Sequence, residues 1–475
     1  MRSGLVTAFA IIAGVTLWRV VWLAWNGTDL FVDEAQYWLW GRNLDFGYYS
    51  KPPMIGWLIR LVTEVSGSSA AFWVRLPAPL LHMLTAILLM LCAREVFGEA
   101  VARWVGPIYV ALPMSSVGSF MLSTDTVMLP FLALALWRYL RLLETRRAGD
   151  AVIAGLALGV GLLSKYAAIY FCIGMGLAAL HQPAARPPVR LALLLLGTAL
   201  LVLSPNLIWN AGHQAVTFRH TADNANWSGG GLHWDRAAEF FFSQFAVVGP
   251  VFFGALLRAC WLAFHRRLPG IALTLLMFAM PVVLLVTGQA LMSRAYANWA
   301  VAAYVAGTIL AVKMLAGRPR WLWAGQALNL CLALALPVLL AMPERVTLPG
   351  GTPLFERYLG RSDVSRWAGD IARQNGIGTI VSDQRDLLAD LHYSLRDTDF
   401  DLFATPPDGA PENYYEQRFA VPEHLEDDTL LLSFRAAPEC PGVVMLAEKA
   451  LDSGAYTNKT LRAARVPARC YRGGN

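Results

Sequence analysis

The run AVIAGLALGVGLLSKYAAIYFCIGMGLAAL at residues 151–180 is apolar throughout, apart from Ser164, Lys165 and two tyrosines. A helix needs about 20 apolar residues to cross a membrane, so this run is too long for one straight span. A lysine in the middle of a bilayer is also costly. We therefore predict two spans, 150–164 and 167–181, which separate at Ser164–Tyr166.

Similar apolar stretches recur through the first 342 residues. With the two above they predict about eleven transmembrane helices, and the other nine stretches are 5–25, 76–93, 104–122, 126–143, 191–209, 240–263, 269–287, 297–315 and 321–342. The first follows the N-terminal charge and has no small-residue cleavage site, which favours a membrane helix over a signal peptide. Residues 1–342 are thus predicted to form a polytopic α-helical membrane domain.

The composition agrees with this interpretation. Of the 475 residues, 56% are hydrophobic and 15% are charged, against about 25% charged residues in soluble domains. Acidic residues concentrate at the end of the chain, where 20 of the 33 Asp and Glu follow Met342. The net charge of +6 is expected to reflect basic loops at the membrane, and no nucleic-acid partner is expected.

The charges of the loops orient the predicted spans. Alternate loops carry basic residues, which the positive-inside rule assigns to the cytoplasm. These residues are Arg94, Arg103, Arg138, Arg141, Arg146, Arg147, Arg186, Arg190, Arg266, Arg267, Lys313, Arg318 and Arg320. The other side receives acidic residues, and an odd number of spans places the tail there. We predict a multi-pass protein of the bacterial inner membrane with a periplasmic tail.

Two regions outside the spans have helical or mixed patterns. In the first outer loop, 26–75, residues 33–44 and 52–65 are predicted helices that lie in the membrane interface. The tail, 343–475, is predicted to be a small soluble α/β domain. Its expected helices are 365–376 and 384–396, and its expected strands are 378–383, 429–434 and 442–449. Cys440 and Cys470 can pair if this tail lies in an oxidising compartment.

The first outer loop holds the leading candidate residues. Asp33 and Glu34 are adjacent on a predicted helix and so point in different directions. A carboxylate beside apolar surface has a raised pKa and can act as a general base. The alternative is that Asp33 only caps the helix that follows. Lys51 precedes two prolines and is expected near the bilayer surface, where it either binds a phosphate or anchors the loop.

Later loops add further polar candidates. Asp125 lies between two spans, where it either has a function or caps the fourth span. Arg219 and Arg294 are phosphate candidates, and Arg294 can equally anchor the interface. The neighbouring polar residues include Asn210, His213 and Tyr296. Together these residues predict an outward-facing membrane site that handles a lipid-linked phosphate compound.

The motifs FVDEAQYWLW at 31–40 and GYYSKPP at 47–53 resemble the first periplasmic loop of the GT-C superfamily of glycosyltransferases. Four more motifs follow in the order found there, and these are LSTD at 122–125, GLLSKY at 161–166, SPNLIWN at 204–210 and RAYANW at 294–299. The combination is similar to the bacterial protein mannosyltransferase-like family. That family includes lipid A aminoarabinose transferases and lipopolysaccharide galacturonosyltransferases.

This resemblance implies a GT-C fold and a reaction. A sugar moves from a polyprenyl-phosphate donor to a cell-envelope acceptor, which is lipid A, the lipopolysaccharide core, another glycan or a protein. By position, Asp33 and Asp125 are the catalytic acids, and Lys51 faces the donor phosphate with Arg294 and Arg219. The other residues expected to line the site are Glu34, Tyr37, Tyr49, Lys165, Asn210, His213 and Tyr296.

The resemblance also implies a one-step displacement that inverts the anomeric carbon. Asp33 accepts the proton of an acceptor hydroxyl, or only positions groups if the acceptor is a phosphate. No cofactor is expected to be required. The aminoarabinose enzymes carry a glutamate just before the loop lysine, where this chain has Ser50. A divalent metal and the identity of the sugar are therefore left open.

Two other functions fit the same topology, namely a transporter or flippase of lipid-linked compounds and a polymerase of envelope glycans. A transporter is expected to show internal repeats and charges at the middle of the membrane. In this sequence the outer acidic residues cluster at loop ends and no repeat is visible. This pattern favours the transferase.

Overall fold

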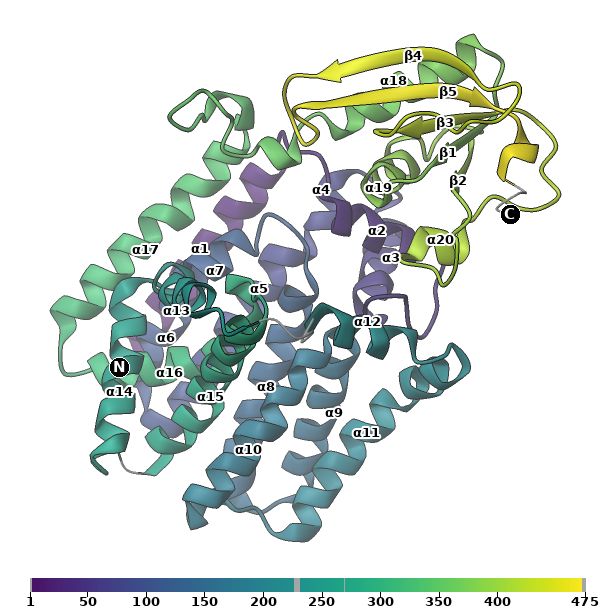
Figure 1. The fold of residues 1–475 in the computed structure, drawn as a ribbon. Coiled ribbons are helices and arrows are strands. Elements are labelled where there is room, and N and C mark those ends of the chain that lie inside the picture. Colours follow the sequence, from purple (N-terminus) through teal and green to yellow (C-terminus); the bar gives the residue numbers. More distant parts are fainter. Residues whose placement is uncertain (1, 226–230, 269, 472–475) are drawn as a thin grey trace. The chain divides into compact units, whose positions relative to one another are not determined.

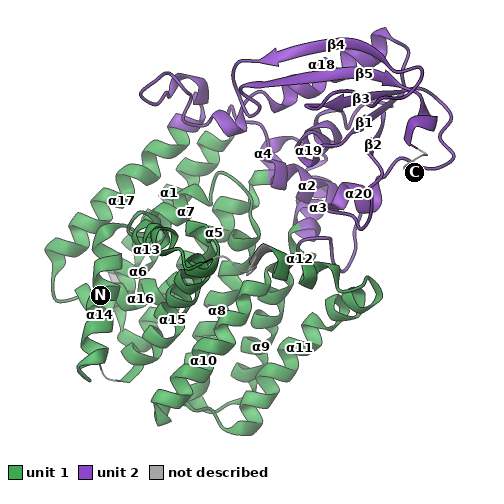
Figure 2. Cartoon of the chain, in the orientation of Figure 1, with its two compact units in different colours: residues 1–24, 51–55, 75–338 green, residues 25–50, 56–74, 339–475 purple. Residues whose placement is uncertain are grey.

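The structure is a computed structural model that describes residues 2–225, 231–268 and 270–471 (Figure 1). The chain divides into two compact units (Figure 2). Unit 1 comprises residues 1–24, 51–55 and 75–338, and unit 2 comprises residues 25–50, 56–74 and 339–475. Most of the first outer loop, assigned from the sequence to the membrane domain, therefore groups with the tail.

Unit 1 is built from helices. They are α1 (Arg2–Leu23), α5 (Pro77–Phe97), α6 (Glu99–Ala111), α7 (Pro113–Val117), α8 (Thr124–Thr145), α9 (Ala148–Ser164), α10 (Tyr170–His181), α11 (Val189–Gly212), α12 (Val216–Ala225), α13 (Trp234–Val248), α14 (Pro250–Phe264), α15 (Gly270–Met292), α16 (Ala303–Leu315) and α17 (Pro319–Leu340). The short 3-10 turns are η1 (Tyr166–Ile169), η2 (Pro183–Ala185) and η3 (Ala297–Ala300).

By length and composition, 6 helices in the described part of the chain can cross a membrane, or up to 7 if one bent pair counts as a span. Three further apolar helices are shorter, at Ala148–Ser164, Tyr166–His181 and Ala303–Leu315. The chain is thus a multi-helix membrane protein. Helix length and composition therefore do not confirm the prediction of eleven spans.

The predicted break in the long apolar run is confirmed. Helix α9 ends at Ser164, and the chain resumes as a helical turn at Tyr166. Lys165 between them has an extended backbone, with φ −159° and ψ 133°. The lysine therefore lies at a helix end, where its side chain can reach polar partners.

Two apolar stretches that were predicted as single spans are each broken by glycine or proline. In 240–263, α13 and α14 meet at an angle of 119°. Gly249 there has φ 87°, and Pro250 has no N–H to continue the helix. In 104–122, α6 ends at Ala111 and Pro113 starts the short α7. Neither stretch therefore forms one continuous helix in the structure.

Small residues let the helices of unit 1 approach closely. Helix α9 packs against both α8 and α11. A Cβ atom on Gly155 of α9 would lie 2.4 Å from the carbonyl oxygen of Leu195 on α11. One on Gly159 would lie 2.6 Å from Cβ of Val202. These glycines are therefore needed for backbone contact, which is how helices associate in lipid.

Several of the loops predicted to be cytoplasmic lie together in unit 1. Arg141 pairs with Glu95 at 3.2 Å, and Arg138 pairs with Asp150 at 3.3 Å. The guanidinium of Arg146 donates to the carbonyl oxygen of Arg186 at 2.6 Å. The basic residues of three alternate loops thus share one end of the helix bundle, in agreement with the predicted loop pattern.

Unit 2 combines the first loop with the tail. Its helices are α2 (Val32–Arg42), α3 (Met54–Ser66), α4 (Ala71–Arg75), α18 (Arg361–Gln374), α19 (Arg385–Ser394) and α20 (Tyr414–Arg418), and the 3-10 turns are η4 (Pro343–Arg345), η5 (Glu356–Tyr358) and η6 (Ala468–Tyr471). The strands are β1 (Thr379–Ser382), β2 (Asp401–Ala404), β3 (Thr429–Ser433), β4 (Val444–Leu451) and β5 (Lys459–Val466). The helices and strands predicted from sequence are present, whereas α4, α20, β2 and β5 were not predicted.

The tail strands form one mixed sheet in the order β2-β1-β3-β5-β4. Strand β1 pairs in parallel with β2 and β3, and β5 pairs antiparallel with β3 and β4. Every residue of β1 and β3 is buried, which explains their continuous apolar patterns. The central strands therefore form the core of the tail.

The tail holds the first loop through several different contacts. Helix α19 packs against α2. Asp29 accepts hydrogen bonds at its Oδ2 from the backbone N–H groups of Arg361, at 2.8 Å, and Ser362, at 3.3 Å, where α18 begins. Arg418 of the tail pairs with Asp45 of the loop at 3.0 Å. These contacts explain why the loop and the tail form one compact unit.

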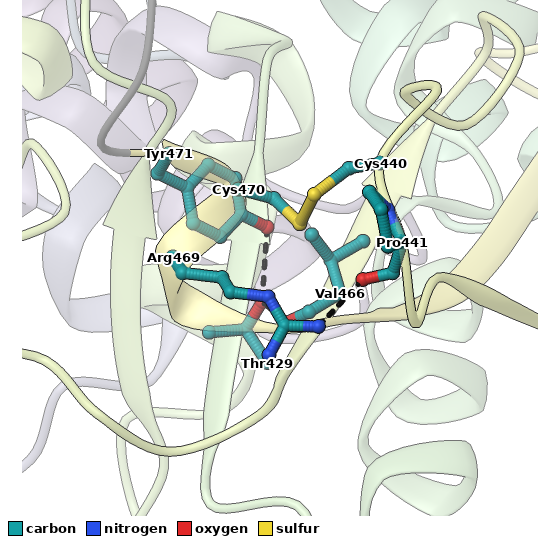
Figure 3. The surroundings of a disulfide bond; sticks show 7 residues. All are labelled: Thr429, Cys440, Pro441, Val466, Arg469, Cys470 and Tyr471. Carbon is teal, nitrogen blue, oxygen red and sulfur yellow. Dashed lines mark hydrogen bonds between the residues drawn. A yellow bond between two sulfur atoms is a disulfide. The ribbon is translucent and has the colours of Figure 1, made fainter.

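A disulfide closes the end of the tail, as Figure 3 shows. Cys440 and Cys470 are joined with their Cα atoms 6.0 Å apart. Beside the bond, Arg469 donates to the carbonyl oxygen of Pro441 at 2.8 Å. The pairing that the sequence left conditional is thus present, and it ties η6 to the loop before β4.

Replacing both Cys440 and Cys470 with serine is expected to destabilise the tail by about 3 to 4 kcal/mol, because the bond closes a loop of this length in the unfolded chain. Hydrogen exchange of the β5 amides in the full-length protein in detergent measures the change. The matched control is Cys331→Ser, since Cys331 is a free, exposed cysteine. Equal β5 protection in the double variant and in the control would contradict the expectation.

The contribution of His392 to the stability of the tail is expected to fall in mild acid. The His392 ring packs against Tyr415 and Phe419, with ring centroids 5.4 and 4.8 Å away, and burial lowers its pKa to about 4. Between pH 6.5 and 4 the unfolded chain binds a proton at His392 that the folded tail excludes, so this contribution falls as pH drops through the window. The buried Asp390 has a raised pKa of about 7 and contributes with the opposite sign.

The loss expected from His392 between pH 7.5 and pH 5 is about 1 to 2 kcal/mol, seen as the difference in pH dependence between the wild type and His392→Phe. It is measured from hydrogen exchange of the β3 amides, corrected for the intrinsic exchange rate. In the variant His392→Phe this component should disappear. A pH dependence that is identical in the variant would show that another group is responsible.

Candidate functional site

An acidic residue of unit 1 lies at the centre of a polar cluster. Asp125 is in the first turn of α8 and is buried, with 8% exposure. The ammonium group of Lys165 donates to both of its carboxylate oxygens, at 2.7 and 2.8 Å. Asn298 in η3 donates to Oδ2 at 3.0 Å. The carboxylate therefore joins three separate segments of the chain.

The proposal that Asp125 only caps the fourth span is wrong. The N-cap of α8 is Ser123, whose hydroxyl accepts from the backbone N–H of Thr126 at 3.2 Å. The side chain of Asp125 is thus available for the cluster with Lys165. An ion pair this deeply buried is retained only where its charges are well paired.

A second polar group lies on the segment that follows Lys165. The hydroxyl of Tyr166 donates to Oδ1 of Asn206 at 2.7 Å, and Asn210 donates to the same hydroxyl at 3.3 Å. The ring of Tyr166 stacks on Phe218 of α12, with centroids 4.9 Å apart. The structure therefore brings together residues from motifs that the sequence placed at separate outer loop ends.

The predicted phosphate-binding residues of unit 1 are more exposed. Arg219 on α12 donates to Gln214 at 3.1 Å, and Arg294 lies with its guanidinium carbon 5.8 Å from the Tyr296 ring. His213 stacks on Trp209 with ring centroids 4.1 Å apart. Lys51 is half-buried just before α3. Arg219 and Arg294 are accessible cations on different segments, whereas Lys165 is already paired.

Neutralising Lys165 should destabilise the protein. Lys165→Met leaves a buried carboxylate without its cation, so we expect a loss of about 3 kcal/mol and a melting temperature in detergent that is roughly 3 to 6 °C lower. The double variant with Asp125→Asn removes both charges and should recover much of the loss. If the double variant melts below both single variants, the ion pair is not what stabilises this region.

The leading candidate, Asp33, occupies an unexpected position. Helix α2 begins at Val32, so Asp33 lies inside its first turn and the interpretation of Asp33 as the cap is wrong. Glu34 makes the capping contact, since its Oε2 accepts from the backbone N–H of Phe31 at 3.0 Å. Glu34 is fully buried, whereas the side chain of Asp33 is 45% exposed. The two adjacent side chains therefore point in different directions, as expected. Glu34 has a structural role, and Asp33 remains accessible.

The carboxylate of Asp33 is held by a residue of the tail. Nη2 of Arg385 donates to Oδ1 of Asp33 at 2.5 Å, and Nε donates to Oε1 of Gln36 at 3.0 Å. Burial opposes the charge of Arg385, but the Asp33 carboxylate raises its pKa above the usual value. Arg385 therefore carries a positive charge beside the accessible acid.

Aromatic side chains make the first loop rigid. Trp40 stacks on Tyr48 with centroids 4.5 Å apart, and the Tyr48 hydroxyl donates to the Trp40 carbonyl oxygen at 2.9 Å. Tyr37 is buried with its ring 5.0 Å from that of Trp40. The Tyr49 hydroxyl donates to the carbonyl oxygen of Pro411 at 3.1 Å. Tyr37 and Tyr49, predicted to line the site, thus support the loop that presents Asp33.

Sequence reasoning missed two arginines. Arg385 gives no local signal, because its partner Asp33 is 352 residues away. Arg19 did give a signal, as an arginine inside the first apolar span. Its guanidinium donates to the Val110 carbonyl oxygen at 2.6 Å and to the Ser116 hydroxyl at 2.9 Å. Arg19 thus stabilises the break between α6 and α7.

Metal binding was left open by the sequence. Across residues 2–225, 231–268 and 270–471, the structure assembles no group of three or more His, Cys, Asp or Glu side chains that would hold a metal ion.

Comparison with known proteins gives matches in both sequence and structure. The family described as dolichyl-phosphate-mannose-protein mannosyltransferase matches residues 50–209. Lipid A galacturonosyltransferase RgtD of Rhizobium johnstonii is 45% identical over 473 residues, which are 99% of each chain. Lipopolysaccharide core galacturonosyltransferase RgtA of the same organism is 27% identical over 197 residues, covering 41% of this chain and 39% of its own.

The fold is similar to solved structures of ArnT from Cupriavidus metallidurans. The structure bound to undecaprenyl phosphate has a TM-score of 0.65 with 18% identity and covers 98% of both chains. The apo structure has a TM-score of 0.64 with 17% identity over the full length of both chains. At this level of identity the likeness establishes the fold.

Proposed function

Because the chain belongs to the GT-C glycosyltransferase family, we propose that it transfers galacturonic acid from a polyprenyl-phosphate carrier to lipid A. It is a membrane glycosyltransferase that uses a polyprenyl-linked donor. The choice of sugar and acceptor rests on the 45% identity to a lipid A galacturonosyltransferase along 99% of both chains. A match of this extent includes the first loop and the tail as well as the helices.

In the proposed reaction, Asp33 is the general base. The acceptor hydroxyl oxygen attacks the anomeric carbon of the sugar, and its proton passes to the Asp33 carboxylate. The bond between the anomeric carbon and the phosphate oxygen breaks, and its electron pair leaves with the polyprenyl phosphate. The exposure of Asp33 and its position on a rigid helix support this role. The single displacement inverts the configuration of the sugar.

The remaining candidates have supporting roles in this proposal. Lys51, Arg219 and Arg294 bind the donor phosphate and stabilise the charge that develops on it as it leaves. Asp125 acts as the second acid by holding Lys165 and the η3 segment in place, which its hydrogen bonds support. Arg294 and Tyr296 directly precede that segment.

We also propose that the chain crosses the bacterial inner membrane eleven times and that its tail is periplasmic. In this arrangement α6 with α7, and α13 with α14, each count as one broken crossing. The gathering of basic loops supports the assignment of one face to the cytoplasm. The disulfide supports an oxidising compartment for the tail.

A reconstituted assay tests the proposed reaction. Purified protein is mixed with polyprenyl-phosphate-linked galacturonic acid and lipid A, and the modified lipid A is measured by mass spectrometry. The wild type is expected to add one sugar with inverted configuration. Asp33→Asn should lower the transfer rate by about 10²- to 10⁴-fold, the usual contribution of a general base, while donor binding persists.

The matched control is Asp399→Asn, which removes an exposed carboxylate of the same unit without touching α2. It should transfer at the wild-type rate. An Asp33→Asn variant that is as active as this control would remove Asp33 from the mechanism. Transfer of a different sugar by the wild type, with none from the galacturonosyl donor, would refute the assigned substrate.

A further inference from the structure

Arg385 is placed to contact more than Asp33. It is the first residue of α19, and its side chain remains 36% exposed beside the accessible acid. Its Nε is held by Gln36 and its Nη2 by Asp33, so the plane of the guanidinium is fixed by two side chains of α2. The planar N–H donors of a guanidinium match the geometry of a carboxylate, so the partner at Nη2 can be exchanged for another carboxylate while Gln36 still holds Nε.

The chemistry of the proposed donor supplies such an anion. Galacturonic acid differs from galactose at C6, where it carries a carboxylate in place of a neutral hydroxymethyl group. Arginine binds carboxylates through paired, charge-assisted hydrogen bonds. A sugar whose anomeric carbon reacts beside Asp33 brings its own carboxylate into the region of the Arg385 guanidinium.

We propose that Arg385 determines the specificity for the sugar by binding the C6 carboxylate of the galacturonosyl donor next to Asp33. This inference rests on the proposed function, because it takes Asp33 as the base. In the free enzyme the Asp33 carboxylate occupies Arg385, and the sugar carboxylate replaces it when the donor binds. Oδ1 of Asp33 is then released to accept the proton of the acceptor hydroxyl.

Such an exchange discriminates against a neutral sugar. A neutral hexose offers Arg385 no carboxylate, so the arginine keeps Asp33 in its ion pair and the base stays engaged. Sites that are built to bind a polar group discriminate strongly against analogues that lack it. Specificity and activation of the base thus arise from one residue of the tail.

The test compares two donors that differ only at C6, polyprenyl-phosphate-linked galacturonic acid and galactose. The kcat/KM for each donor is measured for the wild type and for Arg385→Gln. The wild type should favour the uronic acid. Arg385→Gln should lower kcat/KM for the uronosyl donor by about 10- to 100-fold, the usual value of a charged hydrogen bond, and leave the galactosyl donor unchanged or improved.

Two further variants define the result. Arg418→Gln removes a second ion pair between tail and loop, with Asp45, and should keep the wild-type preference. Arg385→Lys retains the charge without the planar fork, and should show an intermediate preference. It also serves as the test if Arg385→Gln does not fold.

A parallel loss with both donors in Arg385→Gln or Arg385→Lys would show that Arg385 only holds the loop, and would overturn the inference while leaving the proposed function in place. Failure of the wild type with the galacturonosyl donor would instead refute the proposed function, and this inference with it.

Discussion

An ion pair between Asp33 and Arg385, which are 352 positions apart, joins the first loop to the tail. Helix α19 packs against α2, Asp29 binds the start of α18, and Arg418 reaches Asp45. The tail thus holds the first loop in place within unit 2. It determines how the accessible acid is presented, because the only accessible carboxylate of the Asp33–Glu34 pair is the one that the tail arginine holds.

In unit 1, the charged residues within the helices are placed according to the cost of burying a charge. These residues are expensive in an apolar environment, so they pair or cap exposed backbone groups. Lys165 meets Asp125 where two helices end, and Arg19 binds a carbonyl oxygen beside a proline break. Lys165 and Arg19 thus both act where regular helical structure is interrupted.

Much of this could be predicted from the sequence because it is encoded locally. The split at Lys165, the loop helices and the tail elements around β1 and β3 follow from apolar periodicity and from glycine and proline. Glycine or proline also marks the breaks at Gly249–Pro250 and Leu112–Pro113. Each of these apolar runs was long enough for one span, so a single span was predicted in both places. The role of Arg385 had no local signal, because tertiary contact alone brings α19 to α2.

The most direct test of this account is the structure of the protein with a non-reactive analogue of polyprenyl-phosphate-linked galacturonic acid. The account predicts that the anomeric carbon lies beside Asp33, that the sugar carboxylate is hydrogen-bonded to Arg385, and that the ion pair between Asp33 and Arg385 is opened. A sugar bound away from Asp33, with that ion pair intact, would contradict it.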